Sequence, residues 1–331
     1  MKIALLHDSV LPPKNYGGIE RIVMALAREY TRLGHRVTIA ARSASQIQGY
    51  EFCALPDKHN EKDPKSYLPS DVDFIHSHEP LHVKPTIPFL VTIHGNGHPG
   101  EKYFANTNFL SESHCRNHNA KYFVYNGVDP DRYPYSADKK EYYVFLARTT
   151  WRVKNLKTAI SWAKDLDVEL RIMGGSGISR GKIFYHGLVD EPEKLELLKN
   201  ARALIYPTNW DEPCAAAPLE ALACGTPVIT TANGCMPELV RDTGIICRDY
   251  NELLSAHRKL QAVSSEACRR SIEDIFSLKR MAQDYLFLIQ RIIKEGELDH
   301  QPRYAFDKNS VQLLYKPSLK NWLSVKVLGK V

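Results

Sequence analysis

Two glutamates, Glu212 and Glu220, lie eight residues apart in a segment built mainly of small side chains. Apolar patterning predicts a short strand at 204–206 and a helix at 218–224, which places Glu212 in a strand-to-helix loop and Glu220 in the first helical turn. Carboxylates accept hydrogen bonds from vicinal hydroxyl groups, and a helix dipole stabilises negative charge near the helix start. The segment is therefore a candidate site for a sugar, although either glutamate taken alone is better explained as a capping or solvated side chain.

Two cations occur beside another predicted strand. Arg148 directly follows the strand expected at 142–147, and Lys154 directly precedes the helix expected at 155–165. At the carboxyl edge of a parallel sheet, two positive charges and a helix start would converge on one point, which suits a diphosphate. Taken alone, the two cations are better explained as solvated surface charges.

A glycine pair, Gly17 and Gly18, lies between the first predicted strand at 3–6 and the amphipathic helix that follows. Helix starts attract anions, and glycines let a ligand approach the backbone closely. The pattern is not G-x-G-x-x-G, and no acidic residue ends the second strand at 36–40, so a dehydrogenase-type dinucleotide site is disfavoured. A simple tight turn is the alternative interpretation.

The elements that position these residues alternate between strand and helix in two consecutive series, one before residue 126 and one after residue 141. Each series predicts a doubly wound parallel sheet, and such sheets bind ligands outside the carboxyl ends of their strands. The fold class is therefore α/β, with two Rossmann-like domains expected to face a cleft. We predict a first Rossmann-like domain at 1–135 and a second Rossmann-like domain at 136–277. A helix at 278–300 should cross back to the first domain, and 301–331 form a tail of uncertain order.

Composition sets the protein class. The chain of 331 residues is 44% hydrophobic and 25% charged, which excludes a disordered or collagen-like chain. Its net charge of +6 is mild and no run of Lys or Arg occurs, so we expect no nucleic-acid partner. The seven cysteines form no C-x-x-C pair, and no apolar run approaches the ~18 residues of a membrane span. We therefore expect a cytoplasmic protein, with peripheral contact at the inner face of the membrane as the alternative.

An ordered series of motifs relates these candidates to one another. The segment Glu212-x7-Glu220, followed by Ala-Leu-Ala-Cys-Gly-Thr-Pro-Val-Ile, resembles the signature of the retaining GT-B glycosyltransferases of family 4. Further motifs follow in the family's order over about residues 1 to 290. They are Tyr16-Gly17-Gly18-Ile19-Glu20-Arg21, Gly34-His35-Arg36-Val37-Thr38, His76-Ser77-His78, Thr92-Ile93-His94-Gly95, Asn126-Gly127-Val128-Asp129, Leu146-Ala147-Arg148 with Lys154-Asn155, Met173-Gly174-Gly175, His186-Gly187-Leu188-Val189, and Asn233-Gly234-Cys235-Met236-Pro237-Glu238.

The resemblance implies that 1–135 form the acceptor-side domain and 136–277 the nucleotide-sugar domain, and it implies a role for each candidate in the second domain. Arg148 and Lys154 would hold the diphosphate of a nucleotide-sugar donor, and Glu212 would contact hydroxyls of the transferred sugar. Backbone N–H groups near Ala215, Ala216 and Ala217 would assist, and Glu220 would bind the ribose. The glycines at Gly174-Gly175 and the edge at Gly187-Leu188 would frame the base.

In the first domain, the resemblance implies that His94 reaches the sugar or the acceptor. It also implies that Gly17 and Gly18 line the cleft near the donor phosphate or the acceptor.

Two single positions and one loop depart from the family pattern. Ala147 replaces a glycine before the arginine, Asn155 replaces a glycine after the lysine, and Glu212-Pro213-Cys214-Ala215 replaces Glu-Gly-Phe-Gly. The change in the Glu212–Ala215 loop bears more on the identity of the sugar than on the reaction, because alanine in place of the second glycine restricts how closely the backbone approaches the sugar.

The resemblance implies retaining transfer of a hexosyl group from a nucleoside-diphosphate sugar, with UDP or GDP expected, to an acceptor hydroxyl in bacterial glycan or glycolipid synthesis. The acceptor would be a glycan, a glycolipid or a small molecule. Neither cofactor nor metal is expected, since the one Asp-x-Asp pattern, Asp71-Val72-Asp73, leads into a strand of the other domain. The alternatives are a GT-B sugar-nucleotide epimerase or phosphorylase, and a nucleotide-sugar-binding protein with degenerate catalysis.

Overall fold

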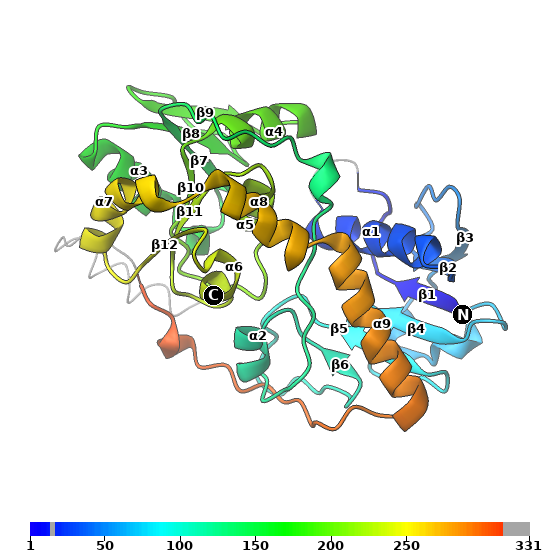
Figure 1. Cartoon of the computed structure of the whole chain (residues 1–331). Coiled ribbons are helices and arrows are strands. Elements are labelled where there is room, and N and C mark those ends of the chain that lie inside the picture. The colour runs from blue at the N-terminus through cyan, green and yellow to red at the C-terminus, as the bar shows by residue number, and fades with distance from the viewer. Residues whose placement is uncertain (14–16, 314–331) are drawn as a thin grey trace. The chain divides into compact units, whose positions relative to one another are not determined.

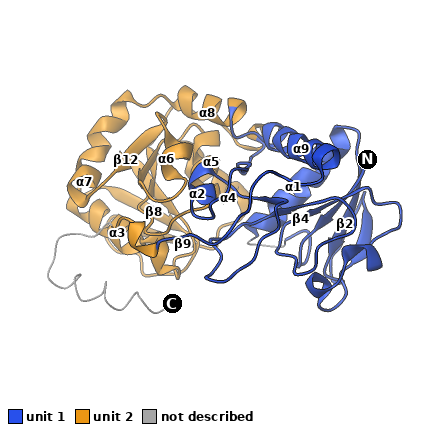
Figure 2. Cartoon of the chain, turned by 90° about the horizontal axis from the view of Figure 1, so that it is seen from below, with its two compact units in different colours: residues 1–129, 275–307 blue, residues 130–274, 308–331 orange. Residues whose placement is uncertain are grey.

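The structure is a computed structural model, and it describes residues 1–13 and 17–313. The described residues divide into two compact units (Figure 2): unit 1 lies within 1–129 and 275–307, and unit 2 contains 130–274 and 308–313. The boundaries between the two domains were predicted near residues 136 and 278, a few residues later in the chain than the boundaries between the two units. The first prediction is late because the prolines around Pro130 resemble a linker. In the structure, η3 (Pro130–Arg132) already belongs to unit 2.

Residues 301–331, predicted as one tail, are divided differently. Residues 301–307 belong to unit 1, where Arg303 forms an isolated β-bridge with Lys102. Residues 308–313 belong to unit 2 and include η6 (Lys308–Ser310). The remainder of the predicted tail, 314–331, lies outside the described residues.

Unit 1 is built on a parallel six-stranded sheet in the order β3-β2-β1-β4-β5-β6. Its strands are β1 (Lys2–Leu6), β2 (Arg36–Ala41), β3 (Glu51–Ala54), β4 (Phe74–Ser77), β5 (Phe89–Thr92) and β6 (Thr107–Asn108), and its helices are α1 (Gly18–Arg32), α2 (Glu112–Arg116) and α9 (Leu278–Glu295), with short turns η1 (His59–Glu61) and η2 (Pro64–Ser66).

The strand β1 shows why this sheet is buried on both faces. Ile3 and Leu5 pack into the cluster that α1 and α9 cover, whereas Ala4 and Leu6 pack into a second cluster on the opposite face. Because successive side chains of a strand point to opposite faces, a continuous apolar run is what a doubly covered strand requires. Figure 1 shows α1 and α9 side by side over the strands of unit 1.

The motif Asn126-Gly127-Val128-Asp129 holds the start of α9 within unit 1. The backbone of Val128 exchanges hydrogen bonds with Phe276 and Leu278. A Cβ atom added at Gly127 would lie 2.6 Å from the carbonyl oxygen of Ser277, so this backbone approach requires glycine. Ser277 then caps α9, its side chain accepting a hydrogen bond from the N–H of Arg280.

Unit 2 repeats the architecture with the strand order β12-β11-β10-β7-β8-β9, again parallel. Its strands are β7 (Tyr142–Leu146), β8 (Glu169–Met173), β9 (Ile183–Gly187), β10 (Ala203–Tyr206), β11 (Val228–Thr231) and β12 (Gly244–Cys247). Its helices are α3 (Leu156–Asp165), α4 (Glu191–Asn200), α5 (Ala216–Ala223), α6 (Met236–Val240), α7 (Tyr250–Lys259) and α8 (Ser265–Asp274), with η4 (Arg152–Lys154) and η5 (Leu260–Ala262). The two parallel doubly wound sheets confirm the predicted α/β class.

One face of the unit 2 sheet packs against α3 and α7 around the buried indole of Trp162. The ring of Trp162 meets Tyr143 edge to face at 4.8 Å, and its N–H donates to the carbonyl of Leu253 at 2.7 Å. The helices α4, α6 and α8 all pack against α5. The right-handed crossovers from β10 to β12 place α5 and α6 on the face opposite α3.

The structure corrects several predicted elements. The apolar segment 122–125, whose sequence predicts a strand, contributes only one bridge, between Phe123 and Phe109. The strands β3, β6 and β9 and the helices α2 and α6 were not predicted from the sequence. The strands β3 and β6 are short or carry polar side chains and pair with a neighbouring strand, and the five-residue helix α2 is capped by Ser111, so none of the three is indicated by a periodicity of its own. Among the helices of the described residues, none combines the length and apolar character that crossing a membrane requires.

Candidate functional site

The candidate site of unit 2 lies where its strand order reverses. The strands β7 and β10 are neighbours, but the sheet continues from β7 to β8 on one side and from β10 to β11 on the other. Such a switch point leaves a crevice at the carboxyl ends of the two central strands, where doubly wound sheets bind ligands. Arg148 and Lys154 lie in the segment after β7, and Glu212 lies in the loop after β10, so the fold brings these two loops together.

The centre of this site is a buried ion pair. The Nζ atom of Lys154 lies 2.6 Å from Oε1 of Glu212, and the two residues are 8% and 3% exposed. Oε1 also accepts hydrogen bonds from the hydroxyls of Tyr206, at 3.0 Å, and Thr208, at 2.9 Å. The sequence analysis assigned these two charges to separate parts of a ligand, whereas in the structure they first satisfy each other.

Two backbone features fix the position of the pair. Asn155 follows Lys154 in the left-handed conformation (φ 59°, ψ 42°), and its side-chain amide donates to the carbonyl of Pro207 at 2.9 Å. Asparagine tolerates this conformation better than other residues with a Cβ atom, which explains how it can replace the family's glycine. A Cβ atom at Gly234 would lie 2.2 Å from the backbone nitrogen of Glu212, so the Asn233-Gly234-Cys235 loop packs directly against the glutamate's backbone.

Aromatic rings surround the lysine. The Nζ atom of Lys154 lies 4.6 Å from the ring centroid of Trp210 and 5.8 Å from that of Trp151. Arg148, which is exposed, has its guanidinium carbon 5.2 Å from the same Trp151 ring. Both cations therefore lie beside one indole ring, a contact worth about 0.5–2 kcal/mol for each cation. The two tryptophans were not among the predicted site residues, although each lies close in sequence to a predicted one.

The start of α5 lies in the same loop region. Its N-cap residue is Ala215, whose methyl side chain cannot accept a hydrogen bond from the first turn. Ala216 is exposed and Ala217 is half-buried, so their backbone N–H groups meet no capping side chain among the described residues. Uncapped N–H groups and the helix dipole make this helix start suited to negatively charged or hydroxyl-bearing ligands.

The structure corrects the predicted position of Glu220. Because α5 begins at Ala216 rather than Pro218, Glu220 lies beyond the first turn, and the proposed stabilisation by the helix dipole does not apply. Its Oε1 atom instead accepts hydrogen bonds from Lys194, at 2.8 Å, and from the hydroxyl of Tyr133, at 3.2 Å. Burial, the largest cause, and the neighbouring Glu220 carboxylate raise the pKa of Tyr133 well above its ordinary value.

The glycines predicted to frame a base bring two loops into contact. Gly174 has a φ of +105°, and a Cβ atom there would lie 2.2 Å from the carbonyl oxygen of Ala147. A Cβ atom at Gly175 would lie 1.8 Å from Oγ1 of Thr149. The loop after β8 can therefore pack against the loop that carries Arg148 only because both residues are glycine. Leu188, just beyond β9, is 81% exposed.

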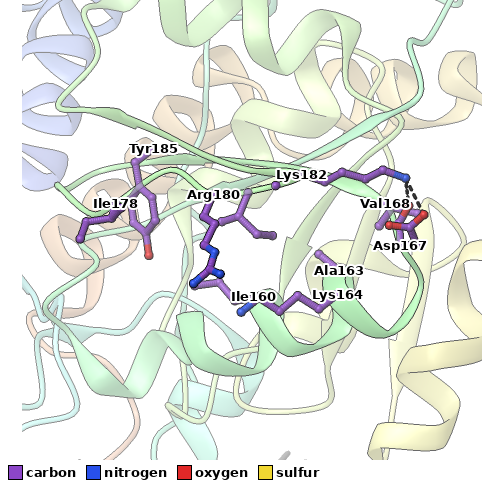
Figure 3. Close-up of a pocket in the computed structure, with 11 residues that line it drawn as sticks. Ile160, Ala163, Lys164, Asp167, Val168, Ile178, Arg180, Lys182 and Tyr185 are labelled. Carbon is purple, nitrogen blue, oxygen red and sulfur yellow. Dashed lines mark hydrogen bonds and ion pairs between the residues drawn. The ribbon is translucent and has the colours of Figure 1, made fainter.

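A separate hollow of about 620 Å³ lies elsewhere in unit 2 (Figure 3). It is lined by residues of α3, the loop before β9 and β9 itself, including Ile160, Arg180 and Tyr185. An ion pair between Lys182 and Asp167, at 2.7 Å, lies at one end of it. The lining contains none of the predicted site residues, so this hollow is distinct from the switch-point site.

The remaining predicted residues belong to unit 1. Gly17 caps the start of α1, and a Cβ atom there would lie 2.6 Å from Cβ of Pro13. Gly18 is the first residue of α1, while Tyr16, from the same motif, lies outside the described residues. His94 follows β5, and its Nε2 atom lies 3.0 Å from Nδ1 of His78. The roles assigned to these residues stay predictions.

The lowered pKa of a buried histidine in unit 1 predicts how the stability of the folded protein depends on pH. Burial, with a smaller contribution from His94, lowers the pKa of the fully buried His76 to about 3, from an ordinary value of 6.5. Between these values the unfolded chain binds a proton that the folded chain does not. Stability should therefore be fully present above pH 6.5 and fall as the pH drops toward 3, by up to about 1.4 kcal/mol per pH unit for this residue.

Urea unfolding at pH 7.5, 6.0 and 5.0 measures this slope. The variant His76→Gln should reduce this slope, while other buried histidines with lowered pKa values, such as His78, keep part of it; His98→Gln, at a side chain that is 75% exposed, should leave the slope unchanged. Equal slopes in the wild type and His76→Gln would show that His76 is not held neutral by the fold.

Comparison with known protein families gives a match that lies in unit 2. Residues 131–274, most of this unit, match the family model described as glycosyl transferases group 1. This group 1 segment contains Arg148, Lys154, Glu212 and Glu220, together with the uncapped start of α5.

Solved structures resemble the chain over both units. The glycosyltransferase AviGT4, described as involved in avilamycin A biosynthesis, is 22% identical, with a TM-score of 0.72 over 89% of this chain and 98% of that one. Anabaena Alr3699/HepE, solved in complex with UDP-glucose, is 14% identical, with a TM-score of 0.64 over 89% of this chain and 99% of that one. These likenesses establish the fold, and the chain has the GT-B fold.

Curated relatives match over shorter stretches. The O-antigen chain mannosyltransferase B of Escherichia coli is 34% identical over 95 residues, which are 28% of this chain and 24% of that protein. Across the curated relatives that the chain matches, the alignments cover between 24% and 37% of the relative's own length.

Proposed function

We propose that this protein transfers a hexosyl group from a nucleoside-diphosphate sugar to an acceptor hydroxyl in bacterial glycan or glycolipid synthesis, with retention of configuration. The observation that carries the proposal is the site inside the group 1 segment. There a buried lysine–glutamate pair, an exposed arginine and an uncapped helix start converge at one switch point. Retention and membership of family 4 rest on the motif resemblance.

The geometry suggests how Lys154 can serve a phosphate while it is paired. An ammonium group has three N–H donors, and in the structure two of them are directed to Glu212 and Tyr206, at 2.6 and 2.9 Å. The third N–H group would donate a hydrogen bond to a phosphate oxygen of the nucleotide sugar, on the side where Arg148 adds a second positive charge. The two cations would then stabilise the departing diphosphate without a metal ion.

The carboxylates and the helix start take complementary roles in this proposal. Glu212, held on Oε1 by three donors, would offer Oε2 to hydroxyls of the transferred sugar. The N–H groups of Ala216 and Ala217 would bind the donor's phosphate or sugar oxygens. Glu220 would accept the ribose hydroxyls by exchanging one of its present partners, Lys194 or Tyr133, for the ligand.

The same site suggests which nucleotide base the protein binds and how the acceptor hydroxyl loses its proton. A β-phosphate oxygen would take the acceptor's proton on the face from which the diphosphate leaves, so no protein nucleophile is needed. We propose UDP or GDP as the nucleotide, with Gly174 and Leu188 framing the base. The complex of Alr3699/HepE with UDP-glucose supports a uridine nucleotide in this fold. The acceptor would be a glycan, a glycolipid or a small molecule, and the reaction would take place in the cytoplasm or at the inner face of the membrane.

A thermal-shift screen with UDP-, GDP-, ADP- and dTDP-sugars tests donor binding. A true donor present at 100 times its dissociation constant should add about 2.7 kcal/mol to the stability of the folded protein. Glu220→Gln should reduce the shift for that donor. Glu196→Gln, at an exposed carboxylate of α4 that contacts Lys199 and Asn200, is the matched control and should keep it.

The products formed from the bound nucleotide sugar distinguish a glycosyltransferase from the alternative functions. Slow release of the free sugar from the donor that binds, unchanged by excess EDTA, supports a metal-independent transferase. Binding without any release would indicate a degenerate nucleotide-sugar-binding protein, and conversion to another nucleotide sugar would indicate an epimerase. Activity that EDTA abolishes and Mg²⁺ or Mn²⁺ restores would contradict the assignment of Arg148 and Lys154 to the diphosphate.

A further inference from the structure

Three histidines gather at the carboxyl ends of the central strands of unit 1. His76 lies within β4, His78 directly follows it, and His94 follows β5. The rings of His76 and His78 are 4.3 Å apart, and those of His78 and His94 are 5.3 Å apart and stacked. Among the described residues, no group of three or more side chains is suited to hold a metal ion.

A single hydrogen bond joins the rings of His78 and His94. The Nδ1 atom of His78 and the Nε2 atom of His94 are 3.0 Å apart, a distance at which one nitrogen donates and the other accepts. Burial holds both rings neutral: it lowers the pKa of His94 to about 3 and that of His78 well below its ordinary value. Each neutral ring carries one N–H, so the direction of this hydrogen bond fixes the tautomer of both histidines.

The other nitrogen of His78 distinguishes the two directions. His78 is 2% exposed, and its Nε2 atom is buried without a hydrogen-bond partner among the described residues. If His94 donated, the hydrogen of His78 would move to Nε2 and become a buried N–H without an acceptor, which folded proteins rarely contain. If His78 donates, Nε2 is a bare nitrogen, and no N–H is left unsatisfied.

We propose that His78 is a positioning residue that donates from Nδ1 to Nε2 of His94 and thereby keeps the hydrogen of His94 on Nδ1. His94, which is half-buried, then presents an N–H group to its ligand. It can donate a hydrogen bond to a sugar hydroxyl or a phosphate oxygen, but it has no free nitrogen with which to accept a proton from the acceptor hydroxyl. The identity of that ligand rests on the proposed function, whereas the tautomer does not.

The tautomer can be measured on the full chain without any ligand. In protein labelled with ¹⁵N-histidine, long-range ¹H–¹⁵N correlation spectra distinguish protonated from bare ring nitrogens, and His94→Asn identifies the signals of His94 by their loss. We expect His94 to show a protonated Nδ1 and a bare Nε2. A protonated Nε2 in the wild type would overturn the proposal, whatever the activity assays show.

Two variants of His78 test its influence on His94. Asparagine can place an amide N–H where Nδ1 of histidine lies, so His78→Asn should keep the wild-type tautomer of His94. His78→Phe removes the donor and should release the His94 hydrogen to Nε2. With the donor found in the thermal-shift screen, His78→Phe should lower kcat/KM roughly fivefold to tenfold, the value of one hydrogen bond, and His78→Asn should restore most of it.

The same spectra separate positioning from a purely structural role. A folded His78→Phe variant in which His94 keeps its hydrogen on Nδ1 would overturn the proposal. If that variant does not fold, the wild-type and His78→Asn spectra decide. Failure to detect any glycosyl transfer would remove the proposed function but leave the measured tautomer, and hence this inference, intact.

Discussion

Lys154→Met should lower the free energy of unfolding by about 3–5 kcal/mol, because it leaves the Glu212 carboxylate buried without its counter-charge. Glu212 is 3% exposed, and the hydroxyls of Tyr206 and Thr208 cannot neutralise it. The loss should appear in urea unfolding monitored by circular dichroism. Transfer activity should fall with it, since the lysine is also the proposed contact to the diphosphate.

The double variant Lys154→Met/Glu212→Gln separates stability from catalysis. Glutamine carries no charge, and its oxygen can still accept from Tyr206 and Thr208, so the double variant should recover most of the lost stability. Activity should not return, because both proposed ligand contacts are gone. Equal stability of Lys154→Met and the wild type would show that the two charges are not buried together. A double variant as unstable as Lys154→Met would show that the loss comes from packing rather than from the charge.

Arg148→Ala should lower turnover by about 10²–10³-fold, or roughly 2.7–4 kcal/mol of transition-state stabilisation, by analogy with the loss of one oxyanion donor. The side chain is exposed and lies beside the Trp151 ring, so its removal should change the melting temperature little. Charge on the diphosphate grows as the sugar–phosphate bond breaks, and an arginine at that position would bind the transition state more strongly than the ground state.

Arg152→Ala is the matched control for this prediction. Arg152 is an exposed arginine four residues further on, in η4, and it is not a predicted ligand residue. It should retain turnover within about twofold, because surface cations that do not touch the ligand contribute little. If Arg148→Ala and Arg152→Ala lose activity equally, the effect is general electrostatic attraction of the donor, and Arg148 has no specific place at the diphosphate.

Sequence-based predictions were correct where the pattern that supports them lies within one helix or strand. The amphipathic helix after Gly18 and the buried strand at the N-terminus were predicted because their periodicity lies within one element. The position of Glu220 within its helix was wrong, because proline is common in the first helical turn and Pro218 suggested a later start than Ala216. The departure at Asn155 was visible in the sequence, but its left-handed backbone and its bond to Pro207 were not.

Contacts between distant loops were not predictable from the residues alone. Lys154 and Glu212 are 58 residues apart in sequence, and they meet because β7 and β10 are adjacent in a sheet whose order reverses between them. His78 and His94, 16 residues apart, meet because β4 and β5 are neighbours that end at the same edge. In both cases the sequence indicated that each residue follows a strand, but not which atom it would contact.

The sequence by itself therefore determined the type and order of most of the longer elements, the α/β class and the set of candidate residues, because hydrophobic periodicity and short motifs are local properties of the chain. Only the tertiary structure decided that Lys154 and Glu212 neutralise each other, that Glu220 is held by Lys194 and Tyr133, and that His78 bonds to His94. These pairings depend on strand order and on the energetic cost of burying polar groups without partners, and both are properties of the packed sheet rather than of any one segment.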